Sequence, residues 1–98
     1  MTITTTRNGS ALTLQLEGRL DTTTSPQLEA ELSASLDGVK QLTLDLQQLA
    51  YLSSAGLRVI LGAQKRMNKQ GTMTVVHVAD AIMEVFEITG FVDILNIQ

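Results

Sequence analysis

The chain of 98 residues contains no cysteine and no tryptophan, one proline, and only three aromatic residues. Without cysteine it cannot form disulfides, use a thiolate nucleophile or build the usual cysteine-bound structural zinc site. Because 44% of its residues are hydrophobic and only 3% are aromatic, we expect a core made mainly of aliphatic side chains.

Basic residues are also scarce. The chain has seven Lys and Arg and ten Asp and Glu, which gives a net charge of -3. This balance, with no basic run, gives no electrostatic footprint for nucleic acid. No apolar stretch approaches the roughly 20 residues of a membrane-spanning helix. Residues 1–6 lack the charged and hydrophobic regions of a signal peptide. We therefore expect a cytoplasmic, monomeric protein with no nucleic-acid or membrane partner.

Turn residues and hydrophobic spacing divide the chain into strands and helices. Asn8-Gly9 favours a tight hairpin turn between two β-rich segments. Pro26, directly after two residues that often cap helices, is typical of a helix start, and Gly90 is typical of a helix end. The predicted strands are residues 3–7, 11–17, 42–46 and 72–78, and the predicted helices are residues 24–38, 54–68 and 80–89. Residues 91–97 are expected to form a last strand or a short tail.

This order of elements predicts an α/β fold, a small mixed β-sheet covered on one face by helices. The Val-rich segment 72–78 is expected to be a central strand. The chain has no internal repeat, low-complexity tract or linker, and its length suits one hydrophobic core. We therefore expect a single domain over residues 1–98.

Two adjacent hydroxyls lie where a strand gives way to a helix. Ser53 and Ser54 come just before apolar residues at helical spacing, which places them at a helix N-terminus. Free N–H groups and the helix dipole at that position favour a capping hydroxyl, and they equally favour an added phosphate. Capping is the commoner role, but one cap requires only one serine. The small residues Ala55 and Gly56 are expected to keep the adjacent surface open to a partner.

Arrangements of residues for catalysis are scarce. The single histidine, His77, lies in or at the end of the Val-rich segment, where a structural hydrogen bond is the expected role. Ser54, His77 and Asp45 could form a triad on paper, but the G-x-S-x-G motif of serine hydrolases is absent. There is no phosphate-binding glycine loop and no cluster of metal-ligating carboxylates. We expect no enzymatic activity, no cofactor and no bound metal.

Three blocks of sequence resemble the STAS domain family, most of all its small single-domain bacterial anti-sigma-factor antagonists. The central block joins the apolar strand at residues 42–46, the junction Ser53-Ser54-Ala55-Gly56-Leu57 and the apolar run at residues 59–62. Residues 16–21 are similar to the family's second motif, and the helix before Thr89-Gly90-Phe91 is similar to its third. The resemblance covers nearly all of the chain, and the central block is its most specific part.

The resemblance implies a partner switch. In this family the unphosphorylated domain binds a serine kinase of the histidine-kinase-like ATPase fold that serves as an anti-sigma factor. Phosphorylation by the kinase reverses the binding, and a phosphoserine phosphatase resets the switch. The family's acceptor serine falls on Ser54. Ser53 stands where the family has an aspartate, so the chain lacks a negative charge beside the acceptor.

The resemblance also implies a partner-binding surface around the acceptor, formed by Asp21, Ser53, Ser54, Gly56, Leu57 and Arg58. Gly56 is expected to keep the approach uncrowded, and Asp21 has a turn or helix-capping role as its alternative. The alternative function is a constitutive STAS scaffold subunit of a transporter or signalling assembly. In that case Ser54 only caps its helix and is not phosphorylated.

Overall fold

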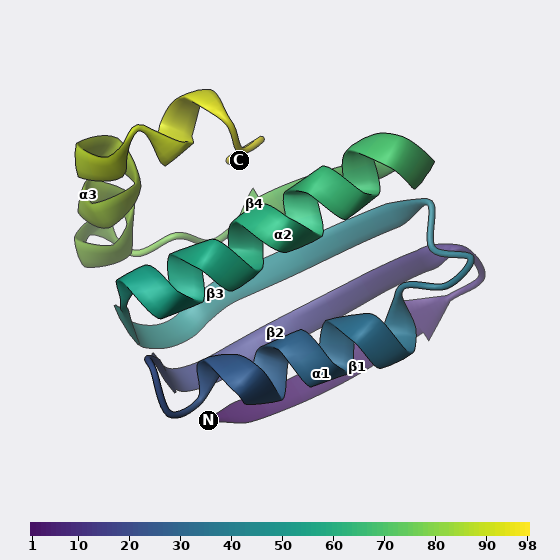
Figure 1. Ribbon diagram of the computed structural model, residues 1–98, viewed down its shortest axis with the longest axis horizontal. Coiled ribbons are helices and arrows are strands. Elements are labelled where there is room, and N and C mark those ends of the chain that lie inside the picture. Colours follow the sequence, from purple (N-terminus) through teal and green to yellow (C-terminus); the bar gives the residue numbers. More distant parts are fainter.

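The computed structural model describes the whole chain, Met1 to Gln98, as a four-stranded sheet with two long helices packed along it (Figure 1). β1 (Thr2–Asn8) and β2 (Ala11–Leu20) form the predicted antiparallel hairpin, and Gly9 in its turn has a φ of 64°. β3 (Gln41–Leu52) is parallel to β2, and β4 (Thr72–Val76) is parallel to β3. The strand order β1-β2-β3-β4 confirms the predicted mixed sheet.

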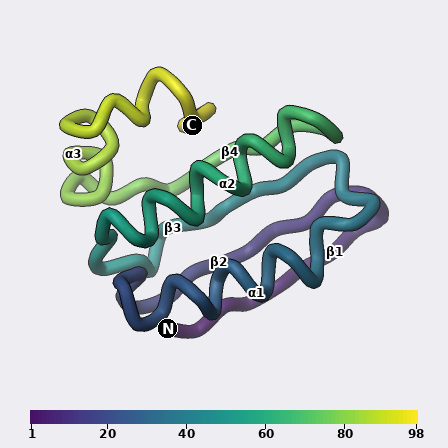
Figure 2. Tube along the Cα trace, in the orientation of Figure 1, coloured from purple at the N-terminus to yellow at the C-terminus, as the bar shows by residue number.

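The helices connect the parallel strands. α1 (Ser25–Ser35) leads from β2 to β3, and α2 (Ser54–Gln70) leads from β3 to β4. α3 (Asp80–Thr89) ends at Gly90, which has a left-handed φ of 79°, and the short 3-10 helix η1 (Phe91–Asp93) follows. Figure 2 shows the trace leaving the sheet after β4, passing through α3 and returning at the C-terminus. None of these helices has the length and apolar character required to cross a membrane.

Alternating leucines on the two central strands build the core beneath the helices. They are at most 1% exposed and comprise Leu12, Leu14 and Leu16 of β2 and Leu42, Leu44 and Leu46 of β3. Leu28 of α1 and Ile60 of α2 are fully buried against them. The core is aliphatic as predicted, and Phe86 of α3 is its one buried aromatic residue.

The opposite face of the sheet is polar, because side chains alternate between the two faces along each strand. A row of paired threonines crosses it through all four strands: Thr6, Thr13, Thr43 and Thr74. A face of this composition has little apolar surface for a helix to cover. The helices therefore cover one face of the sheet, as predicted.

The prediction that the Val-rich strand is central was wrong, because β4 is the last strand of the sheet. Its free edge is shielded by the C-terminal segment. The Val75 N–H donates to Asn96 O at 2.9 Å, and the Gln98 N–H donates to Val75 O at 2.9 Å. This cover lets an edge strand be as apolar as a central one. Residues 91–97 are thus a 3-10 turn followed by one bridge, Val75 to Ile97.

The fold brings two loops together at one end of the sheet. β2 and β3 are parallel and are paired as far as Leu20 and Leu52, so their carboxyl ends lie side by side at the same end of the sheet. The Ser53 N–H donates to Leu20 O at 2.9 Å and ties the two loops to each other. The candidate site is therefore built from the β2–α1 and β3–α2 loops.

Candidate functional site

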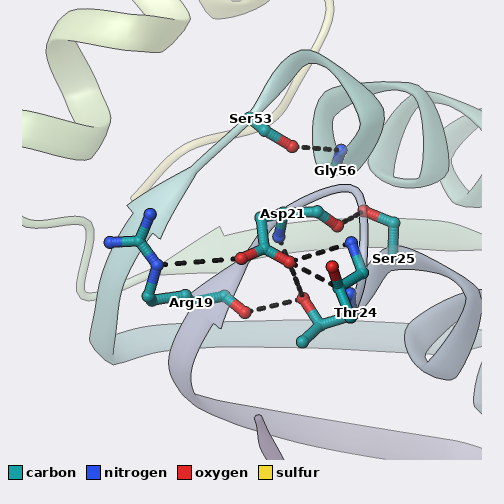
Figure 3. Close-up of polar contacts among 7 residues, drawn as sticks. Arg19, Asp21, Thr24, Ser25, Ser53 and Gly56 are labelled. Carbon is teal, nitrogen blue, oxygen red and sulfur yellow. Dashed lines mark hydrogen bonds and ion pairs between the residues drawn. The ribbon is translucent and has the colours of Figure 1, made fainter.

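Ser53 is the residue that caps α2 (Figure 3). Its backbone is extended, its hydroxyl accepts from the Gly56 N–H at 3.3 Å, and its carbonyl accepts from the Leu57 N–H at 2.9 Å. The hydroxyl thus satisfies one of the N–H groups that a helix N-terminus leaves without an internal partner. Ser53 is held on both sides, by β2 and by the first turn of α2.

Ser54 is the first residue of α2, and its side chain is exposed. Its hydroxyl takes part in none of the side-chain hydrogen bonds of the structure, because the capping position is filled by Ser53. The prediction left open which serine caps the helix. The structure assigns capping to Ser53, so an interpretation in which Ser54 only caps the helix is wrong.

Gly56 and Leu57 lie beneath this surface and do not form part of it. Both are buried, and a Cβ on Gly56 would lie 2.6 Å from Leu20 Cγ and 2.9 Å from Leu52 Cδ1. Gly56 was expected to keep the outer approach uncrowded. The structure instead shows that its missing side chain lets α2 pack closely on the ends of β2 and β3.

Asp21 organises the loop before α1. Its Oδ1 accepts from the N–H groups of Thr23 and Thr24 at 3.0 and 3.1 Å, and its own N–H donates to Thr24 Oγ1 at 2.9 Å. The Ser25 hydroxyl donates to Asp21 O at 2.5 Å. This is the turn role that was predicted as the alternative to partner contact. Figure 3 shows the carboxylate between Thr24 and Arg19, and the Ser25 hydroxyl at the backbone oxygen of Asp21.

Arg19 and Tyr51 add a cationic and aromatic element that sequence analysis missed. Arg19 Nε lies 3.7 Å from Asp21 Oδ2, and its guanidinium carbon lies 4.1 Å from the centroid of the Tyr51 ring. The Tyr51 side chain is exposed, although it is large and mostly apolar. The two residues face each other on neighbouring strands only because the β2–β3 register shifts between Gly18 and Arg19. No local sequence pattern indicates that shift.

The hypothetical Ser-His-Asp triad is not assembled. His77 Nδ1 lies 3.0 Å from Asp45 Oδ1, at the level where Asp45 pairs with Val76. Ser54 follows the end of β3, whose final residue Leu52 is seven residues beyond Asp45. β2 covers the same distance in the five steps from Gln15 to Leu20, so at about 3.3 Å per step the separation is roughly 17 Å. The His77–Asp45 pair is a structural contact, in which His77 adopts a positive φ of 56° directly after β4.

A protein-family model described as "Mlab, STAS domain" matches residues 3–96. The chain belongs to the STAS family. BtrV of Bordetella bronchiseptica, named as an anti-sigma factor antagonist, is 42% identical over 84 residues, which are 84% of this chain and 72% of BtrV. The anti-sigma-B factor antagonist of Staphylococcus aureus is 30% identical over 100% of this chain and 93% of its own length.

Solved structures of the anti-sigma factor antagonist SpoIIAA share this STAS fold. The unphosphorylated form has a TM-score of 0.78 at 16% identity, covering 99% of this chain and 87% of SpoIIAA. The phosphorylated form, described as a Bacillus cell fate determinant, has a TM-score of 0.77 at 17% identity and covers 99% and 91%. At these identities the likeness concerns the fold alone. Both forms match the STAS chain equally well.

Replacing each serine in turn tests which one caps the STAS domain's second helix. We expect Ser53→Ala to lower the free energy of unfolding by about 1 kcal/mol, because it removes the hydroxyl that accepts from Gly56. We expect Ser54→Ala to change it by less than about 0.5 kcal/mol, as for other surface substitutions. Urea unfolding followed by circular dichroism measures both values. Equal losses for the two variants would contradict the assigned cap.

Acid should weaken the STAS domain partly through Asp21. The hydrogen bond from the Thr24 N–H is the main reason why the pKa of this carboxyl lies below its ordinary value of 3.8. Its stabilising effect is therefore complete above the unfolded-state pKa and is lost as the pH falls through the lower folded-state pKa. We expect Asp21→Asn to lose less stability than the unsubstituted chain between pH 5 and about pH 2, measured by urea unfolding. Identical acid profiles would contradict this role.

Proposed function

We propose that this STAS protein is an anti-sigma factor antagonist that works by partner switching. Unphosphorylated, it binds a serine kinase of the histidine-kinase-like ATPase fold that acts as the anti-sigma factor, and phosphorylation of Ser54 releases it. The observation that carries the proposal is the exposed Ser54 hydroxyl, which is unused because Ser53 caps α2. The names of BtrV and of the Staphylococcus aureus relative support the same role.

The modification is an ordinary phosphoryl transfer. The Ser54 Oγ forms a bond to the γ-phosphorus of ATP, and the bond from that phosphorus to the bridging β,γ-oxygen breaks. The hydroxyl proton passes to a base of the kinase, and ADP leaves. A phosphatase reverses the state by hydrolysing the phosphoserine ester to serine and inorganic phosphate. The STAS chain is the substrate in both reactions, so this role needs no catalytic group of its own.

The position of Ser54 allows a phosphate without loss of the fold. The hydroxyl is exposed at the first position of α2, so the added group needs no space in the core. The positive end of the helix dipole favours an anion at that position. The two forms of SpoIIAA, which match this chain with TM-scores of 0.78 and 0.77, also support a switch that preserves the fold.

The proposed contact surface consists of Ser53, Ser54 and Arg58 on the α2 side and Asp21 on the α1 side. Ser54 and Arg58 are exposed, and Ser53 and Asp21 are half-buried. Gly56 and Leu57 would not touch the partner. They contribute indirectly, because their packing against the core fixes the first turn of α2. The partner would therefore recognise two loops whose relative position is set by the parallel ends of β2 and β3.

Intact mass spectrometry with site mapping on the protein from its native cells tests this proposal. We expect a fraction of the chains to carry one phosphate on Ser54, and we expect this species to vanish in Ser54→Ala. The fraction should change with growth conditions. A Ser54 that is unmodified under all growth conditions, together with a stable partner that is not a kinase, would refute the switch and support a constitutive scaffold subunit.

A further inference from the structure

Arg58 follows Ser54 by four residues on α2, and both side chains are exposed. Residues four apart on a helix share one face, with Cβ atoms about 5–6 Å apart. Long helical side chains favour rotamers that lean toward the N-terminus, so the guanidinium of Arg58 can be turned toward Ser54. We propose that Arg58 binds the phosphate of phosphorylated Ser54 within the same chain and positions it on the surface of α2.

Arg58 is the arginine that the fold leaves free. Arg7 donates to backbone carbonyls, Arg19 contacts Asp21 and Tyr51, and Arg66 pairs with Asp37 at 2.9 Å. The guanidinium of Arg58 forms no hydrogen bond or ion pair anywhere in the structure of the 98 residues. It can therefore pair with an added phosphate without breaking an existing contact.

Arg58 also lines a depression of the surface that reaches Ala55, the residue after the acceptor. The depression runs between the N-terminal parts of α1 and α2, and Thr22, Pro26 and Ala55 line it together with Arg58. Ala55 adjoins Ser54 in the chain, and its small side chain leaves room for the guanidinium to approach the phosphate. The pairing thus requires only a rotation of the Arg58 side chain.

Two carboxylates share this region and would compete with the phosphate for Arg58. Glu29 of α1 lines the same depression, but it forms no ion pair with Arg58. Asp21, before α1, is already engaged by the N–H groups of Thr23 and Thr24 and by Arg19. A phosphoserine carries about -1.5 to -2 charges and three acceptor oxygens, so it is the stronger acceptor for a guanidinium.

This pairing extends the effect of one modification to two groups of the contact surface. In the unphosphorylated chain Arg58 is available to a partner. In the phosphorylated chain it is occupied by the phosphate, while Ser54 itself has become an anion. The inference rests on the proposed function, because it describes how the modified Ser54 acts, and it identifies Arg58 as a positioning residue of the switch.

The test uses the full chain with phosphoserine incorporated at position 54 during synthesis, so no kinase is required. Phosphorus NMR titration gives the second pKa of the phosphate, which is ordinarily about 6. A nearby cation favours the dianion, so we expect Arg58→Ala to raise this pKa by about 0.5 pH unit, the effect of an exposed ion pair. We expect Arg58→Lys to retain part of the effect, and 1 M salt to diminish the difference between the unsubstituted chain and Arg58→Ala.

Arg66→Ala is the matched control, because Arg66 lies two helical turns further along α2 and is engaged with Asp37. We expect it to leave the phosphate pKa unchanged. The same pKa in the unsubstituted and Arg58→Ala chains would overturn the proposal, as would equal shifts in Arg58→Ala and Arg66→Ala. Circular dichroism checks that each variant is folded.

The partner switch and the pairing of Arg58 with the phosphate can be refuted independently of each other. If Ser54 is never modified in cells but the synthetic phosphoprotein shows the Arg58 effect, the partner switch is wrong and the pairing stands. If Ser54 is modified in cells but the phosphate pKa is the same in the unsubstituted and Arg58→Ala chains, the switch stands and the pairing is wrong.

Discussion

Phosphorylation of Ser54 is expected to weaken binding to the cognate kinase by more than a hundredfold. A partner that packs over Ser53 and Ser54 must exclude water from this surface. Arg58 offsets only one of the phosphate's roughly two negative charges, so burying the phosphate without a cation from the partner still costs a few kcal/mol. A loss of about 3 kcal/mol corresponds to more than a hundredfold in Kd. Titration calorimetry measures the Kd of the phosphorylated and of the unmodified chain for the purified kinase. The kinase is kept in its ADP-bound form, so that it cannot phosphorylate the chain during the titration.

Charge variants separate a local effect from a change in net charge. Ser54→Asp should weaken binding in the same direction but less, because aspartate carries one charge and fewer acceptor oxygens. Asn68→Asp is the matched control, since it adds the same charge to an exposed position of α2 and retains the oxygen that accepts from Gln64 Nε2. We expect Asn68→Asp to bind normally. A folded, phosphorylated chain that binds as tightly as the unmodified chain would contradict the switch.

The glycines of α2 are expected to respond to the same substitution in opposite ways. In Gly56→Ala the new Cβ would lie 2.6 Å from Leu20 Cγ, so Leu20 and Leu52 must move. Overpacking of this kind costs about 1–3 kcal/mol of unfolding free energy. In Gly62→Ala the new Cβ meets nothing within 4 Å, and the helix gains up to about 1 kcal/mol, because alanine favours helix more than glycine does.

Urea unfolding of Gly56→Ala, Gly62→Ala and the unsubstituted chain measures both effects against one reference. The difference between the two variants should be about 1–4 kcal/mol. Equal stability of the two variants would contradict the close packing at Gly56. We also expect Gly56→Ala to weaken kinase binding, because displacement of Leu20 and Leu52 disturbs the loops that carry Asp21 and Ser53.

The sequence predicted most of the secondary structure because those features follow from local patterns. Alternating leucines define β2 and β3, and Asn8-Gly9 defines the hairpin. The strand-to-helix junction at Ser53 and Ser54 is equally local. The position of β4 was mispredicted because its buried edge depends on residues 96–98, about twenty positions away in the chain.

The finer details of the site depend on contacts between elements, which local patterns do not contain. Ser53, and not Ser54, caps α2 because the Ser53 N–H is bound to Leu20 O and the helix begins at the next residue. The burial of Gly56 depends on the ends of β2 and β3 meeting beneath it. The contact between Arg19 and Tyr51 depends on an irregular strand register.

The most direct test of the central claim is phosphoryl transfer from ATP to three chains: unsubstituted, Ser53→Ala and Ser54→Ala. Each would be incubated with the purified kinases of the histidine-kinase-like ATPase fold from the source organism, and the phosphate would be mapped by mass spectrometry. We predict that at least one kinase modifies the unsubstituted and Ser53→Ala chains on Ser54 and leaves Ser54→Ala unmodified. Phosphate on Ser53, continued modification of Ser54→Ala, or no transfer by any of these kinases would contradict the account.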